Sequence, residues 1–300
     1  MNQSKPISCQ PDPMTFDRTD LACEISDAQT ITQEIQVSLA GEGSAHVLTS
    51  QDGQGRRSVT ISFDKPTLLG ERGLLALSHV LRDQLLTMVK GVLGGELTSQ
   101  TRVLVVGLGN TQMTADAIGP MVAQSVVATR HLKLYEPQLY AELGCSEISS
   151  ITPGVLGQTG MESGEIIKGV VTHINPHVLL VIDALAARDC DRLTTTIQLS
   201  DRGIGPGAGV GNHRMTIDKD AMGCPVLALG VPTVVDSATL VYHALEKAHI
   251  SNQDISPELH QVLENGRGFV VTPKDCDLTV QVLGEVLSKG INLAFGVGEL

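Results

Sequence analysis

Hydrophobic positions alternate with polar ones near the start of the chain and then change to a helical spacing. Between residues 31 and 63, apolar side chains recur mostly at alternate positions, and the glycine-rich stretch 41–55 interrupts them. Alternation of this kind predicts a small β-hairpin or meander. Residues 70–93 instead place leucine, methionine and valine three and four positions apart, which predicts an amphipathic helix. Gly94 and Gly95 mark its end.

A second pattern begins at residues 103–106, where Val-Leu-Val-Val is too short for a helix and predicts a buried strand. The glycine-containing loop 107–110 and a helical segment over 115–131 follow it. Strand and helix patterns then alternate: helix 163–174, strands 178–182, 194–199 and 225–229, and helices 236–249 and 277–293. This order predicts an α/β fold, with a mostly parallel or mixed sheet flanked by helices on both faces and a small N-terminal β-rich region.

The composition limits the function classes. The 300 residues carry a formal net charge of −12, with four phenylalanines, three tyrosines and no tryptophan. An acidic chain with few aromatic side chains argues against direct nucleic-acid binding. No apolar run is long enough for a signal peptide or a membrane span. We therefore expect a protein that does not bind membranes. Because the six cysteines form no Cys-x-x-Cys pair, we also expect reduced thiols and a cytoplasmic location.

Two aspartates follow predicted strands. Asp183 comes directly after strand 178–182, and Asp116 follows the loop after strand 103–106, at the start of a predicted helix. Both are expected at the carboxyl edge of one sheet, where α/β proteins bind ligands. Two neighbouring carboxylates cannot both ionise easily, so such a pair can act as acid and base on a water molecule. The alternatives are a helix N-cap for Asp116 and a structural hydrogen-bond acceptor for Asp183.

Other motifs give weaker signals. Gly107 and Gly109 begin a dinucleotide-binding pattern, but Gln112 stands where its third glycine belongs, so a dinucleotide cofactor is not predicted.

Residues 203–212 carry five glycines at alternate positions. They predict either a backbone that approaches a ligand closely or a flexible surface loop. His213 follows this stretch and is a candidate to reach the site, although a lone histidine is more often incidental.

Ordered blocks of sequence resemble the germination proteases of spore-forming bacteria. Examples are Arg18-Thr19-Asp20-Leu21-Ala22 and Asp116-Ala117-Ile118-Gly119-Pro120. Further blocks occupy residues 104–110, 129–132, 153–157, 181–188, 209–212, 230–236 and 271–274. They keep one order along most of the chain, so the resemblance is specific.

The resemblance implies an endopeptidase that initiates degradation of small acid-soluble spore proteins during germination. It implies a self-processing zymogen, a homotetramer in the spore core, the fold of the hydrogenase maturation endopeptidases, and catalytic aspartates at Asp116 and Asp183. The residues expected to line the site or bind substrate are Gly109, Asn110, Gly209, Gly211, Asn212 and Arg188. No cofactor is expected. The alternatives are a divalent metal at the aspartate pair, with His213 as its third ligand, and a non-catalytic spore protein.

The first residues form a polar, proline-containing leader that ends in a distinctive motif. Residues 19–24 resemble the family's substrate sites, with an acidic residue, an apolar one, a small one and a later glutamate. We therefore expect self-cleavage between Asp20 and Leu21. The chain then divides into a removable propeptide (1–20) and a single α/β protease domain (21–300). In that domain, residues 21–95 form the N-terminal hairpin and helix, and 96–300 form the catalytic core.

Overall fold

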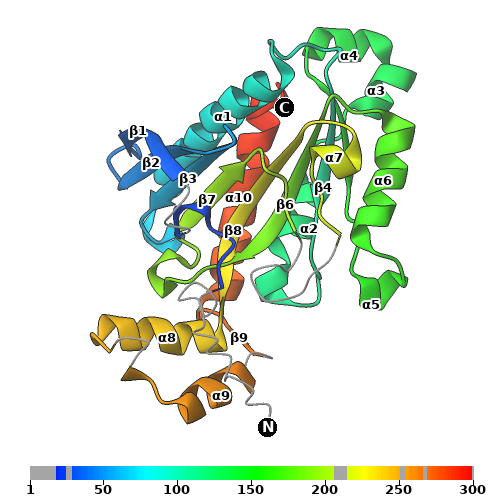
Figure 1. The fold of residues 1–300 in the computed structure, drawn as a ribbon. Helices are drawn as coiled ribbons and strands as arrows, with labels where there is room; N and C mark the ends of the chain where they lie inside the picture. Colours follow the sequence, from blue (N-terminus) through cyan, green and yellow to red (C-terminus); the bar gives the residue numbers. More distant parts are fainter. Residues whose placement is uncertain (1–17, 25–28, 206–214, 251–253, 266–268, 299–300) are drawn as a thin grey trace.

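The computed structural model describes residues 18–24, 29–205, 215–250, 254–265 and 269–298 (Figure 1). One sheet runs through these residues in the order β1-β2-β3-β7-β8-β6-β4-β5, with β9 beside β8. The strands are β1 (Gln29–Ser38), β2 (Ser44–Asp52), β3 (Arg57–Phe63), β4 (Arg102–Gly107), β5 (Glu147–Ile151), β6 (Val178–Ala186), β7 (Thr196–Ser200), β8 (Val226–Asp236) and β9 (Val270–Val271). β1, β2 and β3 form an antiparallel meander, which confirms the predicted N-terminal β-rich region.

The other half of the sheet confirms the predicted α/β fold. β5, β4, β6 and β8 are parallel neighbours, and β7 pairs antiparallel with both β3 and β8, which joins the two halves. The carboxyl ends of the parallel strands share one edge of the sheet, at the lower end in Figure 1. The segments that follow these strands therefore meet at the edge where α/β proteins usually bind ligands.

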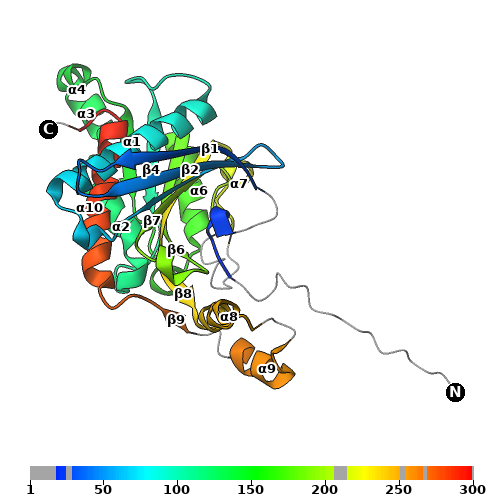
Figure 2. The same ribbon diagram turned by 90° about the vertical axis from the view of Figure 1, so that its left-hand side faces the viewer.

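Helices cover both faces of the sheet (Figure 2). α1 (Glu71–Leu93), α2 (Ile118–Ser125) and α10 (Cys276–Ala294) pack on one face, and α6 (Ser163–Ile174) and α7 (Lys219–Met222) pack on the other. The middle of β4 is apolar on both faces, because Val103 and Val105 join the first apolar cluster and Leu104 and Val106 join the second. The remaining helices are α3 (Arg130–Tyr135), α4 (Pro137–Leu143), α5 (Leu156–Thr159), α8 (Ser237–Lys247) and α9 (Pro257–Asn265), with single turns η2 (Ala22–Glu24), η3 (Pro66–Leu68), η4 (Thr114–Asp116) and η5 (Cys190–Arg192).

The ends of the long helices agree with the sequence pattern. α1 stops at Gly94, which adopts the left-handed conformation (φ 67°) that glycine favours at a helix end. The predicted helices 163–174, 236–249 and 277–293 correspond to α6, α8 and α10 within two residues at each end. Among the helices that the structure describes, none combines the length and apolar character needed to cross a lipid bilayer.

The predicted helix over residues 115–131 is wrong. η4 and α2 occupy its first part, and α3 begins only at Arg130. α2 ends at Ser125 because the chain turns extended at Val126, and Thr129 then bonds to the chain around the start of β5: its N–H donates to the Ile148 oxygen (3.0 Å) and its hydroxyl donates to the Ser146 oxygen (2.6 Å). These bonds tie the chain to β5. The sequence pattern does not predict β5, whose five residues include two serines.

Candidate active site

The loop after β4 places Asp116 at the carboxyl edge of the sheet. Leu108 N–H donates to the Ile182 oxygen (2.8 Å), which ties this loop to β6. Gly109 has φ 119°, and a Cβ there would lie 2.0 Å from the Asp116 carbonyl oxygen, so only glycine fits. Asn110 N–H donates to that oxygen (3.1 Å) and to Oδ2 of the Asp116 side chain (2.9 Å). Gly109 and Asn110, two of the predicted site residues, therefore fix the position of Asp116.

Asp116 is not the N-cap of the helix that follows it. α2 begins at Ile118, and Ala117 occupies the N-cap position without a side-chain cap. The alternative interpretation of Asp116 as a helix N-cap is therefore wrong.

Asp183 lies inside β6 rather than after it. The predicted strand ends at residue 182, but β6 continues to Ala186 because its pairing with β8 continues past Asp183, which stands opposite Gly230. The Asp183 residue is 6% exposed, and its Oδ1 accepts a hydrogen bond from Ala184 N–H (2.9 Å). Asp183 therefore presents a buried carboxyl group within the parallel part of the sheet.

The turn that carries Asp116 packs against the strand that carries Asp183. η4 contacts both β6 and β8. The Thr233 hydroxyl on β8 donates to the Ala115 oxygen (2.6 Å), a contact that no sequence pattern predicts. The two aspartates therefore belong to adjoining elements at one edge of the sheet. Their joint action on a water molecule remains a prediction.

Four of the predicted site residues lie outside the described residues: Gly209, Gly211, Asn212 and His213. Within the described ranges, no three His, Cys, Asp or Glu side chains gather closely enough to hold a metal ion. Asp116 and Asp183 offer two carboxylates, so a metal ion at this pair would need its third ligand from elsewhere in the chain, such as His213.

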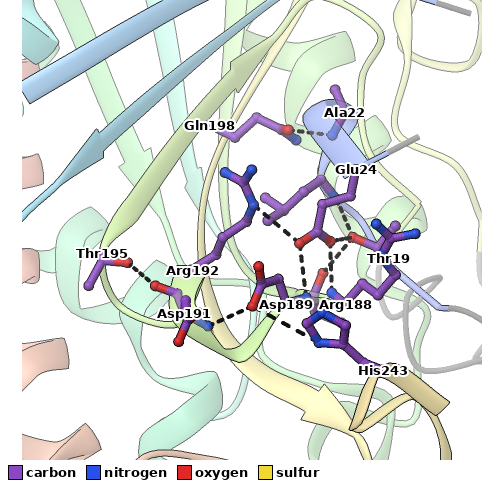
Figure 3. A network of polar contacts seen from close by, with 12 residues as sticks. Thr19, Ala22, Glu24, Arg188, Asp189, Asp191, Arg192, Thr195, Gln198 and His243 are labelled. Carbon is purple, nitrogen blue, oxygen red and sulfur yellow. Dashed lines mark hydrogen bonds and ion pairs between the residues drawn. The ribbon is translucent and has the colours of Figure 1, made fainter. Parts of the chain in front are cut away.

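Residues 18–24 dock beside the carboxyl end of β6 (Figure 3). Asp20 N–H donates to the Ala186 oxygen (2.9 Å), and Asp20 Oδ2 accepts from Ala186 N–H (2.8 Å). The Gln198 side chain on β7 donates to the Asp20 oxygen (3.1 Å) and accepts from Ala22 N–H (2.6 Å). The backbone on both sides of the predicted cleavage bond is therefore held by β6 and β7.

Leu21 anchors this segment. It is 0% exposed and packs in an apolar cluster with Leu185, Ala187, Leu193 and Val235. Leu185 and Asp183 lie on the same face of β6 because successive side chains of a strand alternate. A cavity of about 120 Å³ is lined by residues of the segment and of the sheet, among them Asp20, Ala22, Leu185, Gln198 and Gly230. The cavity thus extends from the docked segment to the residue opposite Asp183.

A larger cavity lies elsewhere. Its volume is about 530 Å³, and it is lined by the β2–β3 turn, the end of α1, the start of α7 and the first residue of β8. None of the predicted site residues lines it. Its size alone therefore does not make it the candidate active site.

The loop after β6 binds the docked segment, and ion pairs of its Asp189 stabilise the loop. Arg188, a predicted site residue, donates its backbone N–H to Glu24 Oε2 (2.7 Å). Next to it, the Asp189 carboxylate accepts from Asp191 N–H (3.0 Å) and lies 3.5 Å from Lys247 Nζ and 4.0 Å from His243 Nδ1. Burial opposes ionisation of Asp189, but the Asp191 N–H, Lys247 and His243 outweigh it and hold the pKa of this carboxyl below its ordinary value.

The lowered pKa of Asp189 predicts a pH-dependent contribution to stability. The ionised group stabilises the folded state above the pKa of the unfolded chain, and this contribution is lost as the pH falls through the folded pKa. We expect Asp189→Asn to lower the free energy of unfolding by about 0.5–1 kcal/mol at pH 7, since the pairs are partly exposed. The deficit should shrink as the pH falls below 4. Urea unfolding at pH 7 and at pH 2.5 would measure this, and an equal deficit at both values would contradict it.

An α/β sheet with carboxyl groups gathered near its carboxyl edge is an architecture typical of enzymes. Comparison with known proteins identifies the class. The family model described as germination protease matches residues 75–250. A germination protease of Caldanaerobacter subterraneus subsp. tengcongensis is 36% identical over 307 residues, which cover 94% of each chain.

Other relatives agree. A germination protease of Clostridium acetobutylicum is 39% identical over 79% of this chain and 77% of the relative. One from Clostridium perfringens is 36% identical over 92% of this chain and 94% of the relative. The protein is therefore a peptidase, and thus a hydrolase. The chain belongs to the germination protease family, which confirms the resemblance drawn from its sequence blocks.

Proposed function

We propose that this peptidase is an endopeptidase that initiates the degradation of small acid-soluble spore proteins during spore germination. The observation that carries the proposal is the carboxyl edge of the sheet, where the loop holding Asp116 is bonded to β6 and Asp183 is buried within that strand. The family membership supports the same activity. We further infer that the enzyme works as a homotetramer in the spore core and needs no cofactor.

In the proposed mechanism, Asp116 and Asp183 bind one water molecule between them. One carboxylate takes a proton from the water as its oxygen attacks the scissile carbonyl carbon. The other carboxyl group, protonated, donates to the developing oxyanion or to the leaving amine. Two carboxyl groups that share a proton titrate as a unit, so the pH profile of cleavage would report two apparent pKa values of the pair.

We also infer that the chain is made as a zymogen and removes residues 1–20 by cutting between Asp20 and Leu21. The docking of this bond against β6, the strand that carries Asp183, supports self-cleavage. Leu21 and Asp183 also face the same side of that strand, which supports access from one side of the sheet.

The proposal predicts cleavage of a purified small acid-soluble spore protein and of the chain itself. Mass mapping would locate the cuts after incubation with and without a metal chelator. We expect defined internal cuts in the spore protein, loss of residues 1–20 from the enzyme, and no effect of the chelator. Activity lost on chelation and restored by a divalent ion would replace the proton-sharing pair with a metal site. An intact substrate under both conditions would contradict the proposed function.

A further inference from the structure

β8 is irregular where it reaches the carboxyl edge of the sheet. Leu185 on β6 pairs with Pro232, but the next residue, Ala186, pairs with Val234. β8 therefore carries one extra residue between these two pairs, Thr233. A bulge of this kind bends the strand and redirects a side chain, and bulges are frequent beside active sites. The bulge at Thr233 is thus a candidate for a role in the site beyond the pairing of the two strands.

The bulged residue is buried and binds the turn that carries Asp116. Thr233 is 0% exposed, and its hydroxyl donates to the Ala115 carbonyl oxygen (2.6 Å) in η4. The carbonyl oxygen of Thr233 accepts from the hydroxyl of Thr272 (2.8 Å), in the chain just after β9. Thr233 therefore connects the sheet to η4, and Thr272 in turn binds the bulge.

The bond from Thr233 fixes the peptide group that precedes Asp116. The Ala115 oxygen belongs to the Ala115–Asp116 peptide, and the N–H of the same peptide donates to the Met113 oxygen (2.8 Å). Both polar ends of this rigid plane are therefore bonded. After Asp116, its own carbonyl oxygen accepts from Asn110 N–H (3.1 Å). Because the peptide planes on both sides are held, the direction in which the Asp116 side chain leaves the backbone is set.

β8 also borders the second carboxyl group. β6 and β8 run side by side, and Gly230 stands opposite Asp183 in their pairing, three residues before Thr233 (Figure 1). Three residues of a strand span about 10 Å. η4, which carries Asp116, packs against both strands. The bond from Thr233 therefore sets the position of η4 relative to the strand pair that holds Asp183.

We propose that Thr233 is a positioning residue for catalysis, whose hydroxyl holds the Ala115–Asp116 peptide against β8 and so sets the separation between the Asp116 and Asp183 carboxyl groups. Thr233 acts through a backbone oxygen and transfers no proton itself. The inference rests on the proposed aspartate pair. Two groups that act on one water molecule tolerate little displacement, because a shift of about 1 Å can cost about 100-fold in rate.

The first test removes the hydroxyl of Thr233. Thr233→Val keeps nearly the shape of the side chain, but the Ala115 oxygen loses its donor. With the full-length chain as enzyme and a purified small acid-soluble spore protein as substrate, we expect kcat per folded molecule to fall about 10- to 100-fold and KM to change less than about twofold. Thr233→Ser keeps the hydroxyl and should restore most of kcat.

A second variant acts on the bulge from an exposed position. Thr272 is exposed, so Thr272→Val should fold like the wild type, but it removes the hydroxyl that binds the Thr233 carbonyl oxygen. The bond from Thr233 to Ala115 remains in this variant. We therefore expect a smaller loss of kcat, about two- to fivefold, again with little change in KM.

The pH profile of kcat reports the carboxyl pair directly. Two carboxyl groups that share a proton repel each other when both are ionised, and this repulsion separates their two apparent pKa values. In Thr233→Val, η4 is released from β8 and the two groups can move apart, so the separation should shrink. A purely structural role would lower the amount of folded enzyme and leave the separation unchanged.

Thr129→Val is the matched control. Thr129 is also 0% exposed, and its hydroxyl donates to the backbone oxygen of Ser146 at the same distance of 2.6 Å. It binds the chain at the amino end of β5, at the opposite edge of the parallel strands from the two aspartates. Urea unfolding should show that both valine variants lose stability, whereas only Thr233→Val should change kcat per folded molecule and the pH profile.

The inference is overturned if Thr233→Val keeps the kcat and pH profile of the wild type, or if Thr233→Ser is as slow as Thr233→Val. An equal loss of kcat in Thr129→Val would overturn it as well, because any buried threonine would then have the same effect. A wild-type chain that leaves the spore protein uncut would instead overturn the proposed function.

Discussion

Asp183→Asn is expected to abolish both self-cleavage and cleavage of spore proteins while leaving the fold intact. Loss of a group that transfers protons in the transition state costs on the order of 10² to 10⁴ in rate. We expect the same loss for Asp116→Asn, since in the proposed mechanism the two carboxyl groups act on one water molecule. The double variant should then be no slower than either single variant, because residues that act as a unit give effects that do not add.

The substitution is conservative for structure. Asparagine keeps an Oδ1 that can accept from Ala184 N–H as Asp183 does, and it has nearly the same volume. Asp218→Asn is a matched control, because Asp218 caps α7 by accepting from Ala221 N–H (2.8 Å) and lines the larger cavity. Asparagine and aspartate cap helices equally well, so this control should keep full activity. Full activity in both Asp116→Asn and Asp183→Asn would refute the pair.

Gly119→Ala is expected to unfold or severely destabilise the protein. A Cβ at Gly119 would lie 2.2 Å from the Leu108 oxygen and 2.5 Å from the Ile182 oxygen. These are backbone atoms of the loop and strand that hold Asp116 and Asp183, so the methyl group can fit only if α2 moves away from the sheet. We expect a loss of about 3 kcal/mol in the free energy of unfolding, with activity reduced in the fraction that folds.

Gly169→Ala is the control for a glycine in a helix. A Cβ there would meet nothing within 4 Å, and the residue lies in the middle of α6. Alanine favours a helix over glycine by about 0.5–1 kcal/mol, so this variant should be slightly more stable than the wild type. Thermal and urea unfolding of both variants would separate the two effects. Equal stability of Gly119→Ala and the wild type would contradict the close packing of α2 on β6.

The strongest elements of the fold could be predicted because their patterns are local. The apolar runs of β4 and β6 indicate buried strands whichever helices cover them. The position of Asp183 then follows from the rule that parallel strands expose their carboxyl ends at one edge. The end of β6 could not be predicted, because its pairing partner in β8 lies about fifty residues away along the chain.

The contacts of Glu24 were beyond prediction for a similar reason. The Glu24 side chain is bound by the backbone N–H groups of Arg188 and Asp189, more than 160 residues further along the chain. Every residue but proline has such a group, so the sequence does not show which ones bind Glu24. The helix predicted over residues 115–131 is wrong because α2 ends at Ser125 and Thr129 bonds to residues 146 and 148, which the local pattern does not show. Local pattern therefore locates the carboxylates, while long-range bonding decides how the chain is held around them.

The buried anchor of the docked segment lies on one side of the predicted cleavage bond. In the proposed cleavage, the buried Leu21 and Glu24 stay with the domain, whereas hydrogen bonds alone, of Arg18 to Thr239 and of Asp20 to Ala186, hold the residues before the bond. A cut at this bond would leave the retained end fixed by burial, and the other end could then dissociate by breaking these hydrogen bonds. The two new ends then lose the high effective concentration that a covalent tether gives them. Re-formation of the peptide bond would then be much slower than dissociation of residues 1–20, so a single cut would be irreversible.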